Sequence, residues 1–286
     1  MKTDRVDLLL AGHVTIDTIV AEGQETLAPG GAVYYGSWPA SLFDIRVGVV
    51  TKLAAQDMHI LDELRAAGIT VYALDGVRTT RIRTTPKSTD FERRSFVVES
   101  QAGPFRAADF EGLGARLILA CPLMVGEMPL EVLAELSKEA DLALDVQGFV
   151  RRPEGRELKS GAWGDMREGL SLVKFLKVDK REVEILTGQP DMAAGIERLA
   201  ALGPQEIVCT HSEGISLWAG GKLASSDFTC SNTSGRTGRG DTAFASYLAA
   251  RLSQDAGEAL ATACRLTSRK LERPGPLKHM GSGLVI

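Results

Sequence analysis

A glycine-rich turn that runs directly into an apolar helix is the part of the sequence best suited to chemistry. It reads SNTSGRTGRGDTAFASYLAARL at residues 231–252. Glycines at 235, 238 and 240 permit positive φ and a close backbone approach, and the first turn of the helix presents unpaired N–H groups. Such a turn is suited to bind an anion such as phosphate. Asp241 lies where the turn becomes the helix, so we expect its carboxylate beside that anion.

A carboxylate next to a bound phosphoryl group can orient and deprotonate an attacking hydroxyl, while backbone amides stabilise the charge on the phosphoryl oxygens. The segment therefore predicts phosphoryl transfer, with Asp241 as the catalytic base and with Gly238, Arg239 and Gly240 forming the anion turn. A plainer interpretation is that Asp241 only caps the helix, because Asp is a favoured N-cap residue.

The rest of the chain alternates short apolar runs with segments of helical period. The runs predict strands and the periodic segments predict crossover helices, which together indicate an α/β fold with a doubly wound, mainly parallel sheet and helices on both of its faces. Such sheets bind ligands beyond the carboxyl ends of their strands. The predicted strands cover residues 6–12, 69–74, 115–121, 142–146, 173–178 and 206–210.

Two stretches, at about 14–35 and 78–103, lack helical periodicity and are rich in Thr, Val, Ile and Arg. They predict antiparallel strands, the second pair joined by a turn from Lys87 to Asp90. We interpret them as a small β-sheet lid that excludes water from the site, within a single domain of residues 1–286; the alternative is a surface hairpin without a function. The exposed edges of a lid would also allow a homodimer by strand pairing.

Composition limits the partners. The net charge of −4 gives no basic field for nucleic acid, so none is expected to bind. The apolar run near the N-terminus is only as long as a strand and follows Asp4 and Asp7, which argues against a signal peptide or a membrane span and predicts a cytoplasmic protein. The four cysteines are far apart, which argues against a zinc site or a disulfide framework.

Several motifs, in the right order, resemble the PfkB, or ribokinase-like, carbohydrate kinases. TGRGDT followed by an Ala-rich helix is similar to the second family signature, written DTxGAGD. AGHVTID resembles the family's first strand, which ends in a substrate-binding Asp, here Asp17. PGGAVYYGS at 29–37 resembles its substrate turn, carried by Gly30 and Gly31.

Three further segments extend the resemblance along the chain. KVDKREVEILTG at 177–188 is similar to the NxxE segment, with Asp179 at the Asn position and Glu182 at the Glu that organises magnesium and the phosphates. CTHSEGISLW resembles the TxGxxG strand-turn beside the nucleotide, which implies nucleotide contacts for Thr210 and Gly214. ALDVQGFVR at 143–151 resembles the segment that carries an Asp along the active-site edge.

The resemblance implies a ribokinase-like fold with a β-lid, ATP and Mg²⁺ as cofactors, and direct transfer of the γ-phosphoryl group to a hydroxyl of a sugar, an inositol-like polyol or a nucleoside. The chain departs from the pattern at Arg236 and Arg239, which place two bulky cations in or next to the anion turn, and we expect one of them to contact a phosphate or an acidic substrate. Tyr34 and Tyr35 follow the substrate turn, and their flat faces suit a sugar ring or base.

The sequence lacks the motifs of several other enzyme classes. A dinucleotide oxidoreductase requires G-x-G-x-x-G after the first strand, where this chain has AGHVTID, and neither a Walker A motif nor a GxSxG nucleophile elbow occurs. The remaining alternative is a sugar- or nucleotide-binding sensor that keeps the fold without turnover. A pure binder would not need Asp241, so the sequence favours the enzyme.

Overall fold

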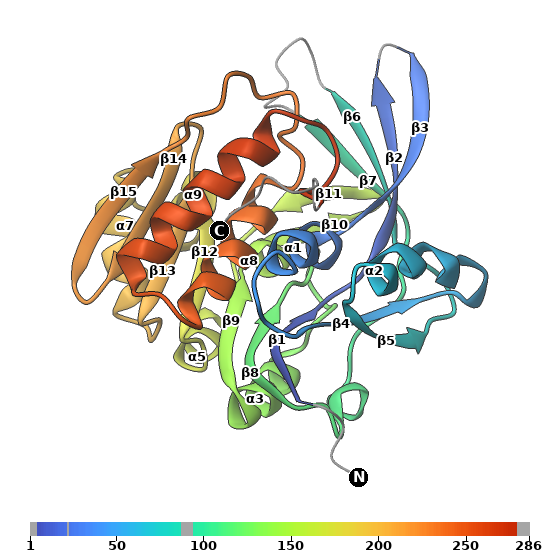
Figure 1. Cartoon of the computed structure of the whole chain (residues 1–286), viewed down its shortest axis with the longest axis horizontal. Helices are drawn as coiled ribbons and strands as arrows, with labels where there is room; N and C mark the ends of the chain where they lie inside the picture. The colour runs from blue at the N-terminus through green and yellow to red at the C-terminus, as the bar shows by residue number, and fades with distance from the viewer. Residues whose placement is uncertain (1–4, 22, 87–93, 279–286) are drawn as a thin grey trace.

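Residues 5–21, 23–86 and 94–278, which the computed structural model describes, form two β-sheets flanked by helices (Figure 1). The larger sheet has nine strands in the order β15-β14-β13-β12-β9-β8-β1-β4-β5. It is parallel from β13 to β5, and β14 and β15 complete one edge as antiparallel strands. Its strands are β1 (Val6–Ala11), β4 (Val47–Leu53), β5 (Thr70–Asp75), β8 (Ala115–Ala120), β9 (Asp141–Asp145), β12 (Phe175–Asp179), β13 (Glu206–Thr210), β14 (Gly214–Ala219) and β15 (Lys222–Asp227).

Helices cover both faces of this sheet, because its strands are apolar on both sides. Leu8 and Leu10 of β1 face one core, whereas Leu9 and Ala11 face the other. Helices on the first face, nearest the viewer in Figure 1, are α1 (Ala32–Ala40), α2 (Asp62–Ala66), α8 (Arg239–Arg251) and α9 (Ala256–Leu271). On the second face lie α3 (Leu130–Glu139), α5 (Met166–Ser171), α6 (Lys180–Thr187) and α7 (Met192–Ala200).

The smaller sheet projects from one end of the larger one, at the upper right of Figure 1. It has six strands in the order β10-β11-β7-β6-β2-β3. Their bounds are β2 (Thr15–Ala21), β3 (Gln24–Gly30), β6 (Arg81–Pro86), β7 (Arg94–Ser100), β10 (Arg151–Glu154) and β11 (Glu157–Ser160), and the short helix α4 (Gln147–Val150) leads into β10.

The two predicted lid segments supply four of these strands, with corrections. Residues 32–35 belong to α1 and not to the lid, because Gly31, at φ 92°, turns the chain into that helix. The hairpin β10–β11 was not predicted, and the Lys87–Asp90 turn lies outside the described residues. In the larger sheet, β4, β14 and β15 are absent from the predicted strands, and a 3₁₀ segment (Ala55–Leu61) leads into α2.

Within residues 5–21, 23–86 and 94–278, no helix is long and apolar enough to cross a membrane.

Candidate active site

The anion turn ends at the start of α8, as expected, but Asp241 does not cap this helix. The N-cap is Gly238, in the left-handed region at φ 82°, and Asp241 is the third residue of the helix. The amide of Arg239 donates to the carbonyl oxygen of Arg236 at 3.1 Å and so closes the turn instead of facing a ligand. The amides of Gly240 and Asp241 lie in the first turn, where no carbonyl within the helix can accept from them.

Close packing explains why glycine is needed at the N-cap. A Cβ on Gly238 would lie 2.1 Å from Cδ1 of Tyr35, in addition to the strain of its positive φ. Tyr35 is buried against this turn, and the buried Tyr34 donates its hydroxyl proton to Glu63. The two tyrosines therefore pack largely inside the protein, and the contact of their rings with a substrate stays a prediction.

A buried ion pair lies beneath the anion turn. Lys177 of β12 donates to Oδ1 of Asp145 at 3.1 Å, and its Nζ is 3.8 Å from Oε2 of Glu182. Burial by itself lowers the pKa of Lys177, but the carboxylates of Asp145 and Glu182 reverse this, and the net pKa is raised. The lysine consequently carries its positive charge at neutral pH.

Asp241 has the electrostatic properties of a general base. Burial, followed by the charge of Asp145, raises its pKa to about 6, against the opposing effects of Lys177, Arg151 and Lys270. The carboxylate is thus ionised at neutral pH but retains more affinity for a proton than an exposed Asp.

Lys270 of α9 anchors the segment that leads into the anion turn. Its Nζ donates to the carbonyl oxygens of Gly235 at 2.6 Å and of Arg273 at 3.3 Å, and it is only 2% exposed. Burial lowers its pKa to about 8, while Asp241 pulls the pKa upward. A second ammonium group therefore ties the turn to the end of α9.

The residues predicted to face the nucleotide lie at the carboxyl edge of the larger sheet. Asp179 and Thr210 are register partners on β12 and β13. Glu182 closes a capping box at the start of α6, where Oε2 accepts from the amide of Asp179 at 2.7 Å. Gly214 begins β14 where β15 passes closely: a Cβ there would lie 2.2 Å from the carbonyl oxygen of Ser226. Nucleotide contacts of these residues stay predictions.

The metal-binding side chains available around Glu182 limit how a magnesium ion can bind. Within the described ranges no group of three or more His, Cys, Asp or Glu residues is arranged to hold a metal. Glu182 is engaged by the Asp179 amide and lies near Lys177, and burial, the largest effect on it, raises its pKa. The residues present fit an ion held mainly by phosphate oxygens and water, with at most one or two carboxylates.

The predicted substrate residues form a second group on the lid strands. Asp17 of β2 accepts a hydrogen bond from Oγ1 of Thr15 at 2.7 Å, and burial raises its pKa to about 6. Neither glycine of the turn tolerates a side chain: a Cβ would lie 2.2 Å from Oδ2 of Asp17 at Gly30, and 2.2 Å from the carbonyl oxygen of His13 at Gly31. The turn is thus built closely around the Asp17 carboxylate.

Helix α1 connects this group to Asp241. The helix begins directly after Gly31. One turn later Gly36 meets α8, where its Cβ position is 3.1 Å from Cβ of Ala245 and 3.4 Å from the carbonyl oxygen of Asp241. The close approach of α1 and α8 holds the substrate turn and the anion turn on neighbouring helices at the same end of the molecule.

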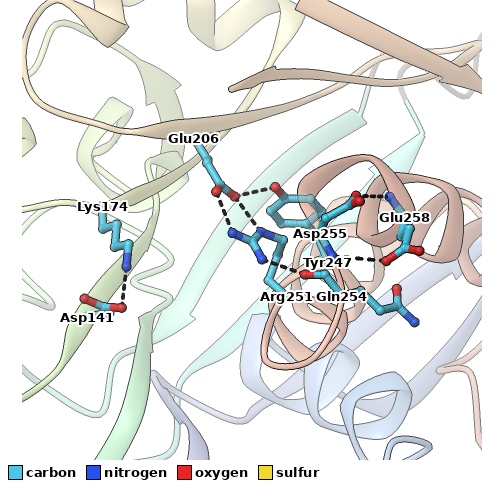
Figure 2. Close-up of polar contacts among 8 residues, drawn as sticks. All are labelled: Asp141, Lys174, Glu206, Tyr247, Arg251, Gln254, Asp255 and Glu258. Carbon is cyan, nitrogen blue, oxygen red and sulfur yellow. Dashed lines mark hydrogen bonds and ion pairs between the residues drawn. The ribbon is translucent and has the colours of Figure 1, made fainter. Parts of the chain in front are cut away.

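The opposite end of α8 is fixed to the larger sheet (Figure 2). Glu206, the first residue of β13, accepts from both Nε and Nη2 of Arg251 at 3.1 and 2.9 Å, and from the hydroxyl of Tyr247. In the same view Asp255 and Glu258 form the capping box that starts α9. This clamp ties the carboxyl end of α8 to the amino end of β13.

A cavity of about 650 Å³ lies beside the lid but does not contain the predicted site. It is lined by Ile16, Leu27, Glu63 and Lys278 among others. Successive strand residues point to opposite faces, so Asp17 faces away from it.

Sequence reasoning passed over Lys177 and Lys270, and it reached Asp145 only through the resemblance of its segment. A lysine in the middle of the apolar run VKFLKV is the signal that could have identified Lys177.

Comparisons with known proteins identify the family and the fold. The family model described as pfkB family carbohydrate kinase matches residues 12–276. A sulfate-complex structure of a pyrophosphate-dependent kinase in the ribokinase family is 32% identical, with a TM-score of 0.90 and coverage of 95% of this chain and 97% of that chain. A pyrophosphate-dependent kinase complexed with a pyrophosphate analog and myo-inositol is 31% identical, with a TM-score of 0.88 and the same coverages of 95% and 97%.

A more distant structure, Arabidopsis thaliana ribokinase with ribose and ATP, is 17% identical with a TM-score of 0.76 and covers 96% of this chain and 95% of its own, which shows the shared fold. Among curated sequences no relative matches.

The fold and the family match define a ribokinase-like phosphotransferase that uses an alcohol group as acceptor. The chain belongs to the pfkB family of carbohydrate kinases, as the sequence motifs predicted.

Proposed function

We propose that this kinase phosphorylates a hydroxyl of a cyclic polyol of the myo-inositol type, with Asp241 as the general base and pyrophosphate as the phosphoryl donor. The observation that carries the proposal is the position of Asp241, whose raised pKa of about 6 suits a base, in the first turn of α8. Acceptor and donor are inferred from the relative crystallised with myo-inositol and a pyrophosphate analog, which is 31% identical over 95% of this chain.

In the proposed reaction, Asp17 and the Gly30–Gly31 turn hold the polyol beneath the lid. The attacking hydroxyl loses its proton to Asp241 as its oxygen forms a bond to phosphorus. The bond from that phosphorus to the bridging oxygen of pyrophosphate breaks, and inorganic phosphate leaves with the electron pair. The amides of Gly240 and Asp241 stabilise the charge on the transferring group.

The turn between β13 and β14 supports a donor smaller than ATP. The amides of Glu213 and Gly214 both donate to Nδ1 of His211, at 3.3 and 3.1 Å. These N–H groups are therefore already hydrogen-bonded within the turn that the sequence predicted to lie beside a nucleotide. ATP, the donor first expected from the family resemblance, is the second candidate.

Magnesium is proposed to bind together with the donor, held by phosphate oxygens and reached by Glu182 through water. When bound, it would neutralise charge on the phosphates.

The proposal is tested by measuring phosphorylated product across a panel of inositols, sugars and nucleosides, with either pyrophosphate or ATP and with Mg²⁺. Turnover of an inositol with pyrophosphate supports both parts of the proposal. Turnover with ATP alone would reassign the donor, and a sugar or nucleoside as the best acceptor would reassign the substrate. If no compound turns over while pyrophosphate still binds, the result would favour the alternative that the protein is a sensor without turnover.

A further inference from the structure

Lys177 occupies a position where a charge is costly. It lies in the middle of β12, between Leu176 and Val178, which are fully buried, and is itself only 4% exposed. Replacement of a buried ion pair by apolar side chains is often neutral or stabilising, so stability alone gives little reason for a lysine here.

The ammonium group has unused hydrogen-bonding capacity. An ammonium carries three N–H donors. Among the described residues, Lys177 donates to Asp145 alone, and its 3.8 Å separation from Oε2 of Glu182 exceeds hydrogen-bond length. The remaining donors are available for a ligand.

This ammonium lies against the anion turn. A Cβ on Gly240 would be 3.2 Å from Nζ of Lys177 and 3.9 Å from Oγ1 of Thr210. The missing side chain at position 240 thus lets the lysine approach the first turn of α8 closely, where the Gly240 and Asp241 amides lie.

We propose that Lys177 is a phosphate-binding residue of the donor site, and that its ammonium donates to an oxygen of the phosphoryl group seated on the Gly240 and Asp241 amides. The inference rests on the proposed function for the identity of the anion. Lys177 interacts electrostatically with Asp145, Glu182, Asp179 and Asp241. An anionic donor entering among four carboxylates needs a fixed positive charge, and the buried Lys177 interacts with all four.

The test compares four variants in binding of methylenediphosphonate, a non-hydrolysable pyrophosphate analogue, by calorimetry in the presence of Mg²⁺. Lys177→Met removes the charge, and Lys177→Met/Asp145→Asn removes it without leaving Asp145 as an unpaired buried carboxylate. Lys177→Arg keeps the charge. Lys174→Met is the matched control, because Lys174 pairs with Asp141 just before the amino end of the same strand (Figure 2).

We expect both Lys177→Met proteins to bind the analogue at least about tenfold more weakly, as the loss of one charge-assisted hydrogen bond predicts. In turnover assays kcat should fall and KM for the donor should rise, while KM for the acceptor stays near the wild-type value. Lys177→Arg should retain part of the analogue affinity, and Lys174→Met all of it.

Folded Lys177→Met or double-variant protein that binds the analogue as tightly as wild type would overturn the inference. A check without a folding risk uses wild-type protein with ¹³Cε-labelled lysine, in which the analogue should perturb the Lys177 signal; an unperturbed signal at saturation would equally overturn it. Failure of the proposed function is distinct: it would appear as wild-type protein that binds the analogue through Lys177 but phosphorylates no acceptor.

Discussion

Lys177 and Asp145 face each other across adjacent strands, as register partners of β12 and β9 with Nζ 3.1 Å from Oδ1. Asp145 ends β9, Lys177 lies two residues before the end of β12, and the lysine packs against Gly240 in the first turn of α8. Their charges act on Asp241 in opposite directions, because Asp145 raises its pKa and Lys177 lowers it. The pair therefore adjusts the pKa of the proposed base and also lies beneath the site.

Activity should fall as the pH drops through about 6. Asp241 must be ionised to accept a proton, and burial and Asp145 raise its pKa to about 6. Asp17, with a pKa also raised to about 6 by burial, offers the substrate hydroxyl the stronger, charged acceptor only when it is ionised. We expect kcat/KM to fall with a slope steeper than one proton below about pH 6. A flat profile down to about pH 5 would contradict these assignments.

Asp145→Asn should move the acid limb of kcat/KM to lower pH. The substitution removes a negative charge that raises the pKa of Asp241, so the base stays ionised in more acidic solution. Turnover at the plateau is expected to decrease as well, because Lys177 loses its partner. The measurement is the pH profile of the variant beside wild type. A limb that moves to higher pH would show that Asp241 does not set it.

Gly238→Ala should impair both stability and donor binding. The added Cβ would lie 2.1 Å from Cδ1 of the Tyr35 ring, and alanine at position 238 would have to adopt φ 82°. Gly68→Ala is the matched control, since Gly68 has φ 80° with nothing within 4 Å of its Cβ position. The control should lose about 1–2 kcal/mol of unfolding free energy from backbone strain, and Gly238→Ala about 1–3 kcal/mol more from overpacking. Equal losses in denaturant titrations would mean that the turn relaxes freely.

Glu206→Ala should destabilise the protein through the clamp at the far end of α8. It removes the acceptor of Arg251 and Tyr247 (Figure 2), and we expect a loss of about 1–3 kcal/mol. Asp141→Ala, which breaks the more exposed pair with Lys174, should change stability by less than about 0.5 kcal/mol. Thermal unfolding of the two variants checks this; similar melting temperatures would argue against the clamp.

The sequence predicted the features that depend on local pattern. Apolar runs predicted the strands that carry Asp145, Asp179 and Thr210, and the glycine-rich turn predicted where α8 begins. Resemblance to the family added the substrate turn at Gly30 and Gly31, and the positive φ of Gly31 and close contacts at both positions now explain why glycine stands there.

Features that depend on packing between distant segments could not be predicted in the same way. The cap position is one example: Asp is a frequent N-cap, but contact with Tyr35 requires glycine at 238, which moves Asp241 into the helix. The charge environment is another. Lys177 and Asp145 are 32 positions apart in sequence, and only the parallel pairing of β12 with β9 brings them together. The burial of Tyr34 and Tyr35 likewise follows from the packing of α1 on its neighbours.

The most direct test of the central claim is turnover by Asp241→Asn, measured with the acceptor and donor that the wild-type enzyme uses best. The substitution keeps the shape of the side chain but removes the base. We predict that kcat falls by about 10²–10⁴-fold while methylenediphosphonate and the acceptor bind as they do to wild type. Turnover within a few-fold of wild type, with normal binding, would contradict the assignment of Asp241 as the base.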